Sequence, residues 1–286
     1  PHHPDKGPAA TRLRAPLPFP RSSREGRHGT GPRRYLADVA AVTVNADVGE
    51  SLGPVAFGTE PAFMDDVDWV NVACMWHIDA PAVMDRVVAE AVRRGLAVGA
   101  HPGLPVVGAT RRLPRATADD VADLLLYQVG ALEAFLRLHG ATLHHIKPHG
   151  ALYGVLAWEE ELMRGAARVA ALYGVPFVGM AGTAHEAVCR EMGVPFVAEL
   201  YVELDYRADG TVILQRRPLP REPADVEARL RAALTGQGIE AVDGTRLQVR
   251  FDSIGIHADI GGATAVARTV RRILDAHGVS APRPPS

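Results

Sequence analysis

The sequence predicts an α/β fold in which seven strands and their helices form a (β/α) barrel. Three observations predict this fold. From Val42 onward, short apolar runs rich in β-branched residues alternate with longer stretches of helical period. Strands joined by helices pair in parallel through right-handed crossovers. Polar residues directly follow most of the apolar runs, as expected where barrel strands end at one shared mouth.

The predicted strands are short and recur along the whole chain after residue 41. They span Val42–Ala46, Trp69–Ala73, Ala97–Ala100, Leu143–Ile146, Pro176–Met180, Pro195–Tyr201 and Leu247–Ile256. Helical periodicity occurs near residues 80–94, 118–139, 158–173, 183–192, 222–235 and 262–277. The helix at 118–139 is the clearest, because Thr117 is a suitable N-cap, Leu and Val recur at helical spacing and Gly140 can end it.

A doubly wound open sheet is the alternative that periodicity alone leaves open. Its outer strands would end too far apart to share one pocket. Polar motifs follow strands from both ends of this chain, such as NADVGE after the first strand and IHAD after the last. The barrel accounts for these motifs, because all of its strand ends face one mouth.

Length and composition fit one large hydrophobic core, since the chain has 286 residues and is 47% hydrophobic. The net charge of −2 provides no field that would attract nucleic acid or an anionic membrane. No apolar run approaches the roughly 20 residues that cross a bilayer. The two cysteines, Cys74 and Cys189, form no disulfide framework. We therefore expect a cytoplasmic protein.

Residues 1–40 differ from the rest of the chain, because they are rich in Pro, Gly and Arg and carry no periodic apolar pattern. Such a segment cannot bury enough apolar surface to offset chain entropy. We predict a disordered basic tail at 1–40 and a catalytic (β/α) barrel domain at 41–280.

The first candidate site residues follow the first strand, in NADVGE. Asp47 and Glu50 lie three residues apart, and two close carboxylates can have their pKa values pushed apart to give one proton donor and one base. A helix N-cap with its capping-box partner explains the same spacing. Asn45 points inward from the strand, where it could hold a substrate carbonyl or pair with the next strand.

Two histidines follow the second and third strands. His77, in CMWHID, is a candidate ligand or catalyst that Asp79 strengthens, although a histidine after an aromatic residue also fits a packed core. His101 leaves the third strand beside Pro and Gly, where the backbone must turn sharply. That turn directs the imidazole outward from the strand end.

The motif KPHGALY after the fourth strand is the most specific local signal, with Lys147, His149 and Tyr153 within seven residues. A lysine among apolar walls has either a lowered pKa or an anionic partner. His257 and Asp259 follow the last strand at i, i+2 spacing, which places both on one side. They could form a hydrogen-bonded pair or bind a metal ion.

Three functions are compatible with these residues. A carboxylate could activate water to hydrolyse an amide, while Lys and His donors stabilise the oxyanion. A metal ion could assist hydrolysis, bound by Asp47, His77 and either His101 or His257, although no H-x-x-x-H or H-E-x-x-H spacing is present. The third is a non-catalytic subunit that binds a carboxylate. Because the phosphate loop G-x-x-x-x-G-K followed by Ser or Thr is absent, any ATP would bind another chain.

The ordered motifs NADVGE, VNVAC with its later His, GAHPG, YQVGAL, KPHGALY and IHAD resemble those of the LamB/YcsF family over about residues 42–278. The resemblance implies a barrel related to glycoside hydrolases and deacetylases. It also implies ATP-dependent opening of 5-oxoproline, or of a related lactam, to the amino acid. Two partner subunits, B and C, similar to the allophanate hydrolase pair, would supply the ATP chemistry. A divalent metal is compatible with the motifs.

The resemblance also assigns roles to the candidate residues. The implied catalytic residues are Asp47, Glu50, His77, Lys147 and His149, with Asp47 or Glu50 as the base. The implied substrate-binding residues are Asn45, His101, Tyr153, His257 and Asp259.

Several loops depart from the family pattern. Where the family usually shows CGFHAGDP, this chain has CMWHIDAP, and YVELDY replaces FADRxY, so that Leu204 stands at an arginine position. Gln215 likewise stands where the family has the arginine of VPR. Loss of arginines weakens the capture of a small carboxylate. The departures therefore predict a divergent member, with 5-oxoproline or another cyclic amide as its substrate.

Overall fold

The computed structural model describes residues 41–50, 60–74, 81–105, 116–213, 219–258 and 260–281. The predicted tail at 1–40 lies outside the described residues. Two candidate site residues, His77 and Asp259, also lie outside the described residues. The same holds for Asp79 and Gln215, which belong to the loops that depart from the family pattern. None of the described helices is both long and apolar enough to cross a bilayer.

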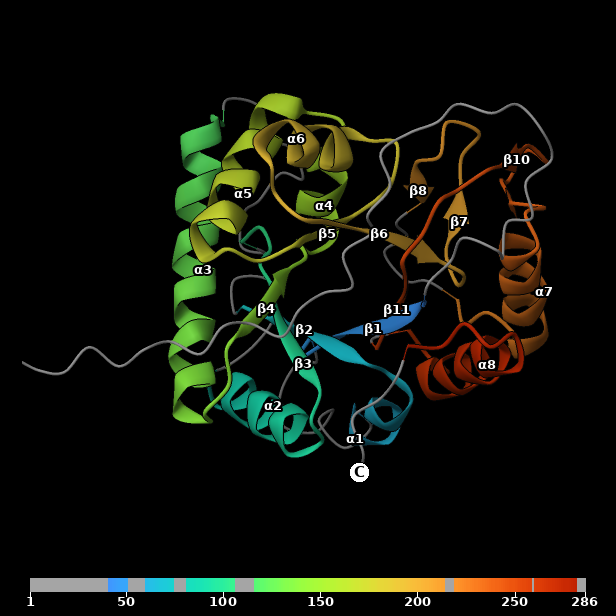
Figure 1. The fold of residues 1–286 in the computed structure, drawn as a ribbon, viewed down its shortest axis with the longest axis horizontal. Coiled ribbons are helices and arrows are strands. Elements are labelled where there is room, and N and C mark those ends of the chain that lie inside the picture. Colours follow the sequence, from blue (N-terminus) through green and yellow to red (C-terminus); the bar gives the residue numbers. More distant parts are fainter. Residues whose placement is uncertain are drawn as a thin grey trace, which may run out of the picture. The chain divides into compact units, whose positions relative to one another are not determined.

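Seven parallel strands close into a barrel, which confirms the predicted fold (Figure 1). Around the barrel the strands follow the order β1-β11-β6-β5-β4-β3-β2. Their bounds are β1 Thr43–Val48, β2 Trp69–Ala73, β3 Ala97–His101, β4 Leu143–Ile146, β5 Phe177–Gly179, β6 Phe196–Tyr201 and β11 Ser253–His257. Because β1 pairs with both β2 and β11, residues from the two ends of the described chain lie side by side.

Helices surround the strands, as Figure 1 shows. Their bounds are α1 Glu60–Phe63, α2 Pro81–Arg93, α3 Ala118–Leu138, α4 Gly150–Leu156, α5 Glu160–Tyr173, α6 Ala184–Met192, α7 Pro223–Leu234 and α8 Ala263–Ala276, with a 3-10 helix η3 at Met64–Asp66. The predicted cap of α3 is confirmed, since Thr117 accepts the Asp120 N–H and the Asp120 side chain accepts the Thr117 N–H. The sequence prediction missed α1 and α4; α4 begins directly after His149 and carries Tyr153.

Two small hairpins were also not predicted. Strands β7 (Asp205–Tyr206) and β8 (Val212–Ile213) form one, and β9 (Ile239–Glu240) and β10 (Arg246–Leu247) form the other. The predicted strand Leu247–Ile256 was therefore too long at its start. Directly before Ser253, Asp252 is held by its side chain as well as its backbone: its carboxylate accepts the Ala198 N–H, and its backbone N–H donates to the Ala198 carbonyl.

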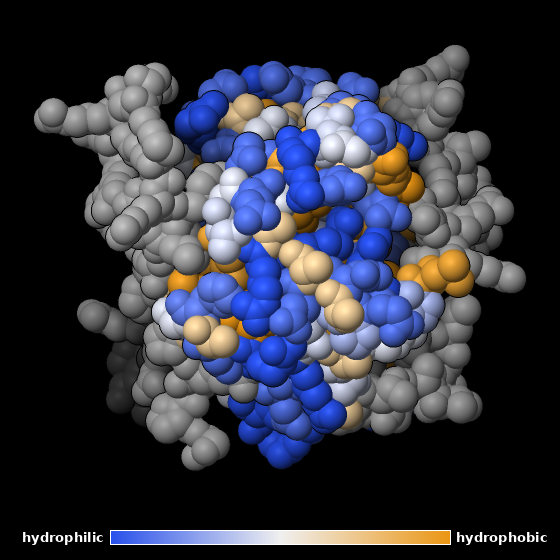
Figure 2. Space-filling view, turned by 90° about the vertical axis from the view of Figure 1, so that its right-hand side faces the viewer, coloured by the Kyte–Doolittle hydropathy of each residue, from blue (hydrophilic) through white to orange (hydrophobic). Residues whose placement is uncertain are grey.

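The face that carries α7 and α8 is predominantly hydrophilic, with hydrophobic residues scattered among the polar ones (Figure 2). An ion pair links α8 to α7, with Arg272 2.5 Å from Glu227, and Arg231 within α7 lies 2.8 Å from the same carboxylate. Exposed pairs of this kind contribute little to stability, and they keep the surface polar.

The interior of the barrel is unusually polar, and glycines in its strands make room for the polar groups. A Cβ at Gly99 would lie 2.1 Å from Nε2 of the fully buried His145. A Cβ at Gly255 would lie 2.3 Å from Oε1 of Glu199. Any larger residue at these positions would displace a polar side chain, so the glycines shape the floor of the site.

Candidate functional site

The centre of the site is a lysine held between two carboxylates. Lys147 follows β4, and its Nζ lies 2.8 Å from Oδ1 of Asp47 on β1 and 2.8 Å from Oε1 of Glu199 on β6. The third neighbour is Oδ1 of Asn45, at 3.1 Å. The ammonium group donates hydrogen bonds to Asp47 and Asn45, and Glu199 is its second ion-pair partner. The structure thus joins the first and fourth strand ends, as the polar motifs predicted.

The charges of this group are set by burial and pairing. Burial alone would lower the pKa of the Lys147 ammonium, but attraction to Asp47 and Glu199 outweighs it and raises the pKa. Burial would raise the pKa of Asp47, but His101, Lys147 and His257 together lower it to about 2. Lys147 and Asp47 are therefore both ionised at neutral pH. The sequence left open whether Lys147 has a lowered pKa or an anionic partner, and the structure shows the anionic partner.

A chain of hydrogen bonds below Asp47 fixes its orientation. The Nδ2 of Asn71 on β2 donates to Asp47 Oδ1 and to Asn45 Oδ1, each at 2.7 Å. Burial holds the pKa of His145 well below its usual range, so this ring is neutral and its Nε2–H donates to Asn71 Oδ1. Lys147 and Asn71 thereby occupy Oδ1 of Asp47, and Oδ2 is the oxygen that meets the site histidines.

Sequence reasoning did not assign Asn71 a role, although an Asn inside the apolar run WVNVA was a usable signal. Of the two histidines in LHHI, His145 reaches this network through Asn71. His144 contacts the Trp69 and His145 rings and lines no part of the cavity described below.

The second group at the mouth consists of Glu50, His101 and His149. Oε1 of Glu50 lies 2.6 Å from Nδ1 of His149 and 3.1 Å from Nε2 of His101, and these two nitrogens are 3.2 Å apart. Burial would raise the pKa of Glu50, but hydrogen bonds from both histidines hold it well below the usual range. The pKa of His149 is raised, because the pairing with Glu50 outweighs its burial.

These three residues could hold a divalent metal ion, because one ligand atom from each lies within 4.8 Å of the others. Nδ1 of His101 lies 2.7 Å from the carbonyl oxygen of Lys147, which can only accept, so Nδ1 carries the proton. With Nδ1 anchored in this way, Nε2 is the atom that faces the other two groups, and a metal ion there would displace the Nε2 proton that Glu50 accepts. The donor set of two imidazoles and one carboxylate suits zinc.

A buried histidine–glutamate pair forms the third group. Oε1 of Glu203, just after β6, lies 2.6 Å from Nδ1 of His257 and accepts the His257 backbone N–H at 2.7 Å. Burial would lower the pKa of His257, but the bond to Glu203 and attraction to Asp47 raise it to about 9. His257 is therefore an imidazolium at neutral pH. The sequence analysis assigned Glu203 no role, although this residue lies within YVELDY, directly after the sixth predicted strand.

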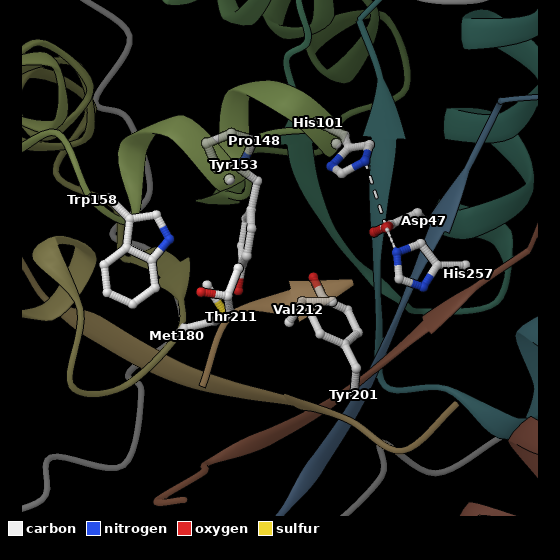
Figure 3. Close-up of a pocket in the computed structure, with 12 residues that line it drawn as sticks. Asp47, His101, Pro148, Tyr153, Trp158, Met180, Tyr201, Thr211, Val212 and His257 are labelled. Atoms are coloured by element: carbon white, nitrogen blue, oxygen red, sulfur yellow. Dashed lines mark ion pairs between the residues drawn. The ribbon is translucent and has the colours of Figure 1, made fainter. Parts of the chain in front are cut away.

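A cavity opens beside these groups, with about 420 Å³ of empty space when the adjoining open solvent is included. Asp47, His101 and His257 form one side, and the Nε2 atoms of both histidines lie 3.6 and 3.7 Å from Asp47 Oδ2 (Figure 3). The rest of the lining consists of Pro148, Gly150, Tyr153, Gly154, Trp158, Met180, Tyr201, Thr211 and Val212.

The structure thus brings most of the predicted site residues together. Asn45, Asp47, Glu50, His101, Lys147, His149, Tyr153 and His257 all lie at or near this mouth. The additional members are Asn71, Glu199 and Glu203. His77 and Asp259 belong to the segments outside the described residues.

The fold and the site together define the class of protein. It is a closed parallel barrel whose mouth, at the carboxyl ends of the strands, holds buried acids, a lysine and histidines. The model of the LamB/YcsF family matches residues 42–285, and the chain belongs to that family.

This chain covers nearly the whole length of several similar proteins. The A subunit of 5-oxoprolinase from Thermococcus onnurineus is 34% identical over 244 residues, 84% of this chain and 96% of that protein. The lactam utilization protein lamB of Emericella nidulans is 33% identical over 237 residues, 81% and 93% of the two chains. The crystal structure of a lactam utilization protein from Thermus thermophilus is 38% identical, with a TM-score of 0.73 over 84% of this chain and 98% of that one.

Lys147→Met should destabilise the fold in a pH-dependent way. The change leaves the Asp47 and Glu199 carboxylates buried without their cation, which costs about 3–5 kcal/mol of unfolding free energy at neutral pH. The pKa of Asp47 then rises, because the attraction to Lys147 that lowered it is gone, so the loss shrinks as the pH falls and Asp47 becomes protonated. Urea unfolding at several pH values measures this difference.

The matched control is Arg137→Met, which removes an exposed pair with Glu133 and should change stability little at any pH. A Lys147→Met loss that stays constant from neutral to acidic pH would contradict the assigned ion pairs.

Glu203→Gln should lower the pKa of His257 from about 9 to near or below its usual 6.5, because the neutral amide removes the paired charge. An NMR titration of the His257 ring protons measures this. The raised pKa of His257 adds to the free energy of unfolding. This contribution is fully present below pH 6.5 and is lost as the pH rises through about 9. Glu203→Gln should lack this pH-dependent contribution. The exposed Glu222→Gln is the control, and an unchanged His257 titration in Glu203→Gln would refute the pairing.

Proposed function

We propose that this chain is a hydrolytic subunit that opens the C–N bond of a cyclic amide, with 5-oxoproline or a related lactam as substrate. The observation that carries the proposal is the shared cavity in which the Asp47 carboxylate meets His101 and the cationic His257. Amide hydrolysis needs a base for water and a donor for the developing oxyanion, and these groups supply both. The names of the lactam-related relatives support the same reaction.

In the proposed reaction, a carboxylate orients the attacking water and accepts its proton. Asp47 presents Oδ2 to the cavity, while Glu50 forms a proton-sharing pair with His149 that can serve as the base. The water oxygen forms a bond to the carbonyl carbon, the C–N bond of the ring then breaks, and the nitrogen takes up the proton that the base accepted from water. One new carboxylate and one amine result, which together are the open-chain amino acid.

The oxyanion donor in this proposal is His257 rather than Lys147. We expected Lys147 to stabilise the oxyanion, but its buried ammonium group donates to Asn45 and Asp47 and is paired with Glu199. The imidazolium of His257 lines the cavity and has Nε2 on the cavity side, because Nδ1 is bound to Glu203. Lys147 then acts by keeping Asp47 ionised and in place.

Coupling to ATP forms the second part of the proposal. A five-membered lactam is a stable amide, so its opening benefits from transfer of the terminal phosphoryl group of ATP to the amide oxygen, with ADP as the leaving group. Addition of water and cleavage of the C–N bond then give an acyl phosphate, and a second water releases inorganic phosphate and the carboxylate. The sequence contains no phosphate loop of the Walker type. Relatives are named as one subunit of 5-oxoprolinase, which indicates an assembly of several different chains. We therefore place the ATP chemistry on partner subunits B and C that resemble the allophanate hydrolase pair.

A metal-dependent amidohydrolase is the alternative that one observation favours, namely the group Glu50, His101 and His149. A zinc ion held there would lower the pKa of a bound water and polarise a carbonyl. His101 would keep its Nδ1–H on the Lys147 carbonyl, which fixes the ring for binding through Nε2.

Asp47→Asn and Glu50→Gln should each reduce lactam opening by at least about 100-fold, because each removes a carboxylate that can accept the proton of water. The measurement is depletion of 5-oxoproline and of other lactams by the chain, with and without partner subunits and ATP. The exposed Leu172→Ala is the control and should keep full activity. Unchanged turnover in both acid variants would instead support a non-catalytic, substrate-binding subunit.

The metal alternative predicts one zinc ion per chain after dialysis against zinc, measured by elemental analysis. Glu50→Gln and His149→Ala should lose that ion, because each removes one of the three ligands. His139→Ala should retain it, since His139 pairs with Asp85 outside the site. Wild-type protein without bound zinc, yet with full activity, would exclude this alternative.

A further inference from the structure

Tyr201 adjoins two cationic groups of the site and takes no part in the proposed chemistry. It is the last residue of β6, and it lines the cavity although only 4% of the residue is exposed. Its ring centroid lies 5.2 Å from Nζ of Lys147 and 5.0 Å from the centroid of the His257 ring. Figure 3 shows the Tyr201 and His257 rings next to each other at the edge of the cavity.

Strand geometry places Tyr201 against His257. Gly255 on β11 pairs with Tyr201 in the sheet, and His257 is the next residue of β11 on the same face. A Cβ at Gly255 would lie 2.7 Å from Cε1 of Tyr201, so this glycine leaves the space that the Tyr201 ring fills. The phenol ring therefore lies across β11 and reaches the imidazole of His257.

Hydrogen bonds fix Tyr201 at its backbone and at its hydroxyl. The hydroxyl donates to Oε2 of Glu199 at 2.6 Å, and Oε1 of the same carboxylate pairs with Lys147. The Tyr206 hydroxyl, in β7, accepts the Tyr201 N–H at 2.9 Å and donates to the Tyr201 carbonyl at 3.1 Å. Burial raises the pKa of the Tyr201 phenol well above its usual range, and Glu199 adds to this effect, so the phenol remains a donor.

The contact between the two rings restricts the imidazole of His257. Their planes are 31° apart, so the rings are nearer to stacked than to perpendicular. Stacked aromatic rings attract each other, and a cation is attracted to the face of a phenol ring. The charged groups that face His257 are Glu203 at Nδ1 and Asp47 near Nε2, with Lys147 farther away. Glu203 thus fixes one ring nitrogen, and the Tyr201 ring fixes the plane that contains the other.

We propose that Tyr201 is a positioning residue, whose ring holds the His257 imidazole in the plane that directs Nε2 at the substrate. This inference rests on the proposed lactam-opening function, in which His257 donates to the developing oxyanion. Such a donor acts only when it points at the oxygen, so the effect of Tyr201 belongs to the transition state rather than to substrate binding. The hydroxyl has a separate role, because it holds Glu199 in place.

NMR of a chain with labelled histidine and tyrosine tests the ring contact directly. Nuclear Overhauser effects between the Tyr201 and His257 ring protons should be present in the wild-type chain. In Tyr201→Leu the His257 ring protons should shift, because the ring current of the phenol is lost, whereas Tyr201→Phe should keep them near their wild-type positions. All spectra are compared at one pH well below the His257 pKa of about 9. The exposed Tyr127→Leu is the control and should leave these signals unchanged.

Steady-state kinetics of lactam opening, with partner subunits and ATP, measures the consequence for the reaction. Tyr201→Leu should lower kcat at least about tenfold and change KM less than about threefold, because a misdirected donor loses a transition-state interaction. Tyr201→Phe should recover most of that kcat, although the lost bond to buried Glu199 should lower its midpoint of urea unfolding. Tyr127→Leu should keep the wild-type kcat and KM. Tyr201→Met takes the place of Tyr201→Leu if the latter does not fold.

The outcomes distinguish the inference from the function on which it rests. Absent Overhauser effects, an unchanged kcat in Tyr201→Leu, or equal losses in Tyr201→Leu and Tyr201→Phe would overturn the positioning role while lactam opening stands. If the wild-type complex opens no lactam, the proposed function fails and the catalytic role of Tyr201 fails with it. The NMR spectra then still decide whether the two rings are in contact.

Discussion

The buried pairing of Lys147 with Asp47 and Glu199 is the interaction on which the rest of the site depends. Each partner comes from a different strand, so the pairing forms only when β1, β4 and β6 are closed into one barrel. An ammonium group buried without its partners would be neutralised, and the carboxylates would take up protons. The same contacts that hold the strand ends together therefore keep Asp47 ionised and directed at the cavity.

A polar barrel interior is costly unless its groups are hydrogen-bonded, and this interior is organised to meet that requirement. Asn71 uses both of its Nδ2 hydrogens on Asn45 and Asp47, and its oxygen meets His145. Gly99 leaves the space that the His145 ring fills. The cavity groups are thus oriented by a layer below them that touches no solvent. Such support is what allows a carboxylate to keep one oxygen available for chemistry.

The three groups at the mouth differ in charge because their partners differ. The pKa of Asp47 is lowered by surrounding cations, whereas the pKa of His257 is raised by Glu203. Glu50 and His149 share a proton or, with His101, could bind a metal ion. The Asp47 carboxylate and the His257 cation therefore line one cavity. An apolar side with Trp158 and Met180 lies opposite them.

The sequence by itself determined the barrel, most strand positions and the membership of Asp47, Lys147 and His257 in one mouth, because strand periodicity and the polar residues after each strand are local signals. Its errors lie where local signals fail: Leu247–Ile256 was predicted as one strand, and α4 was missed because it is short and begins after His149. Only the tertiary structure decided the partners. Glu203 and Asn71 acquire their roles through contacts with residues 54 and 24 positions away, and no periodicity encodes such contacts.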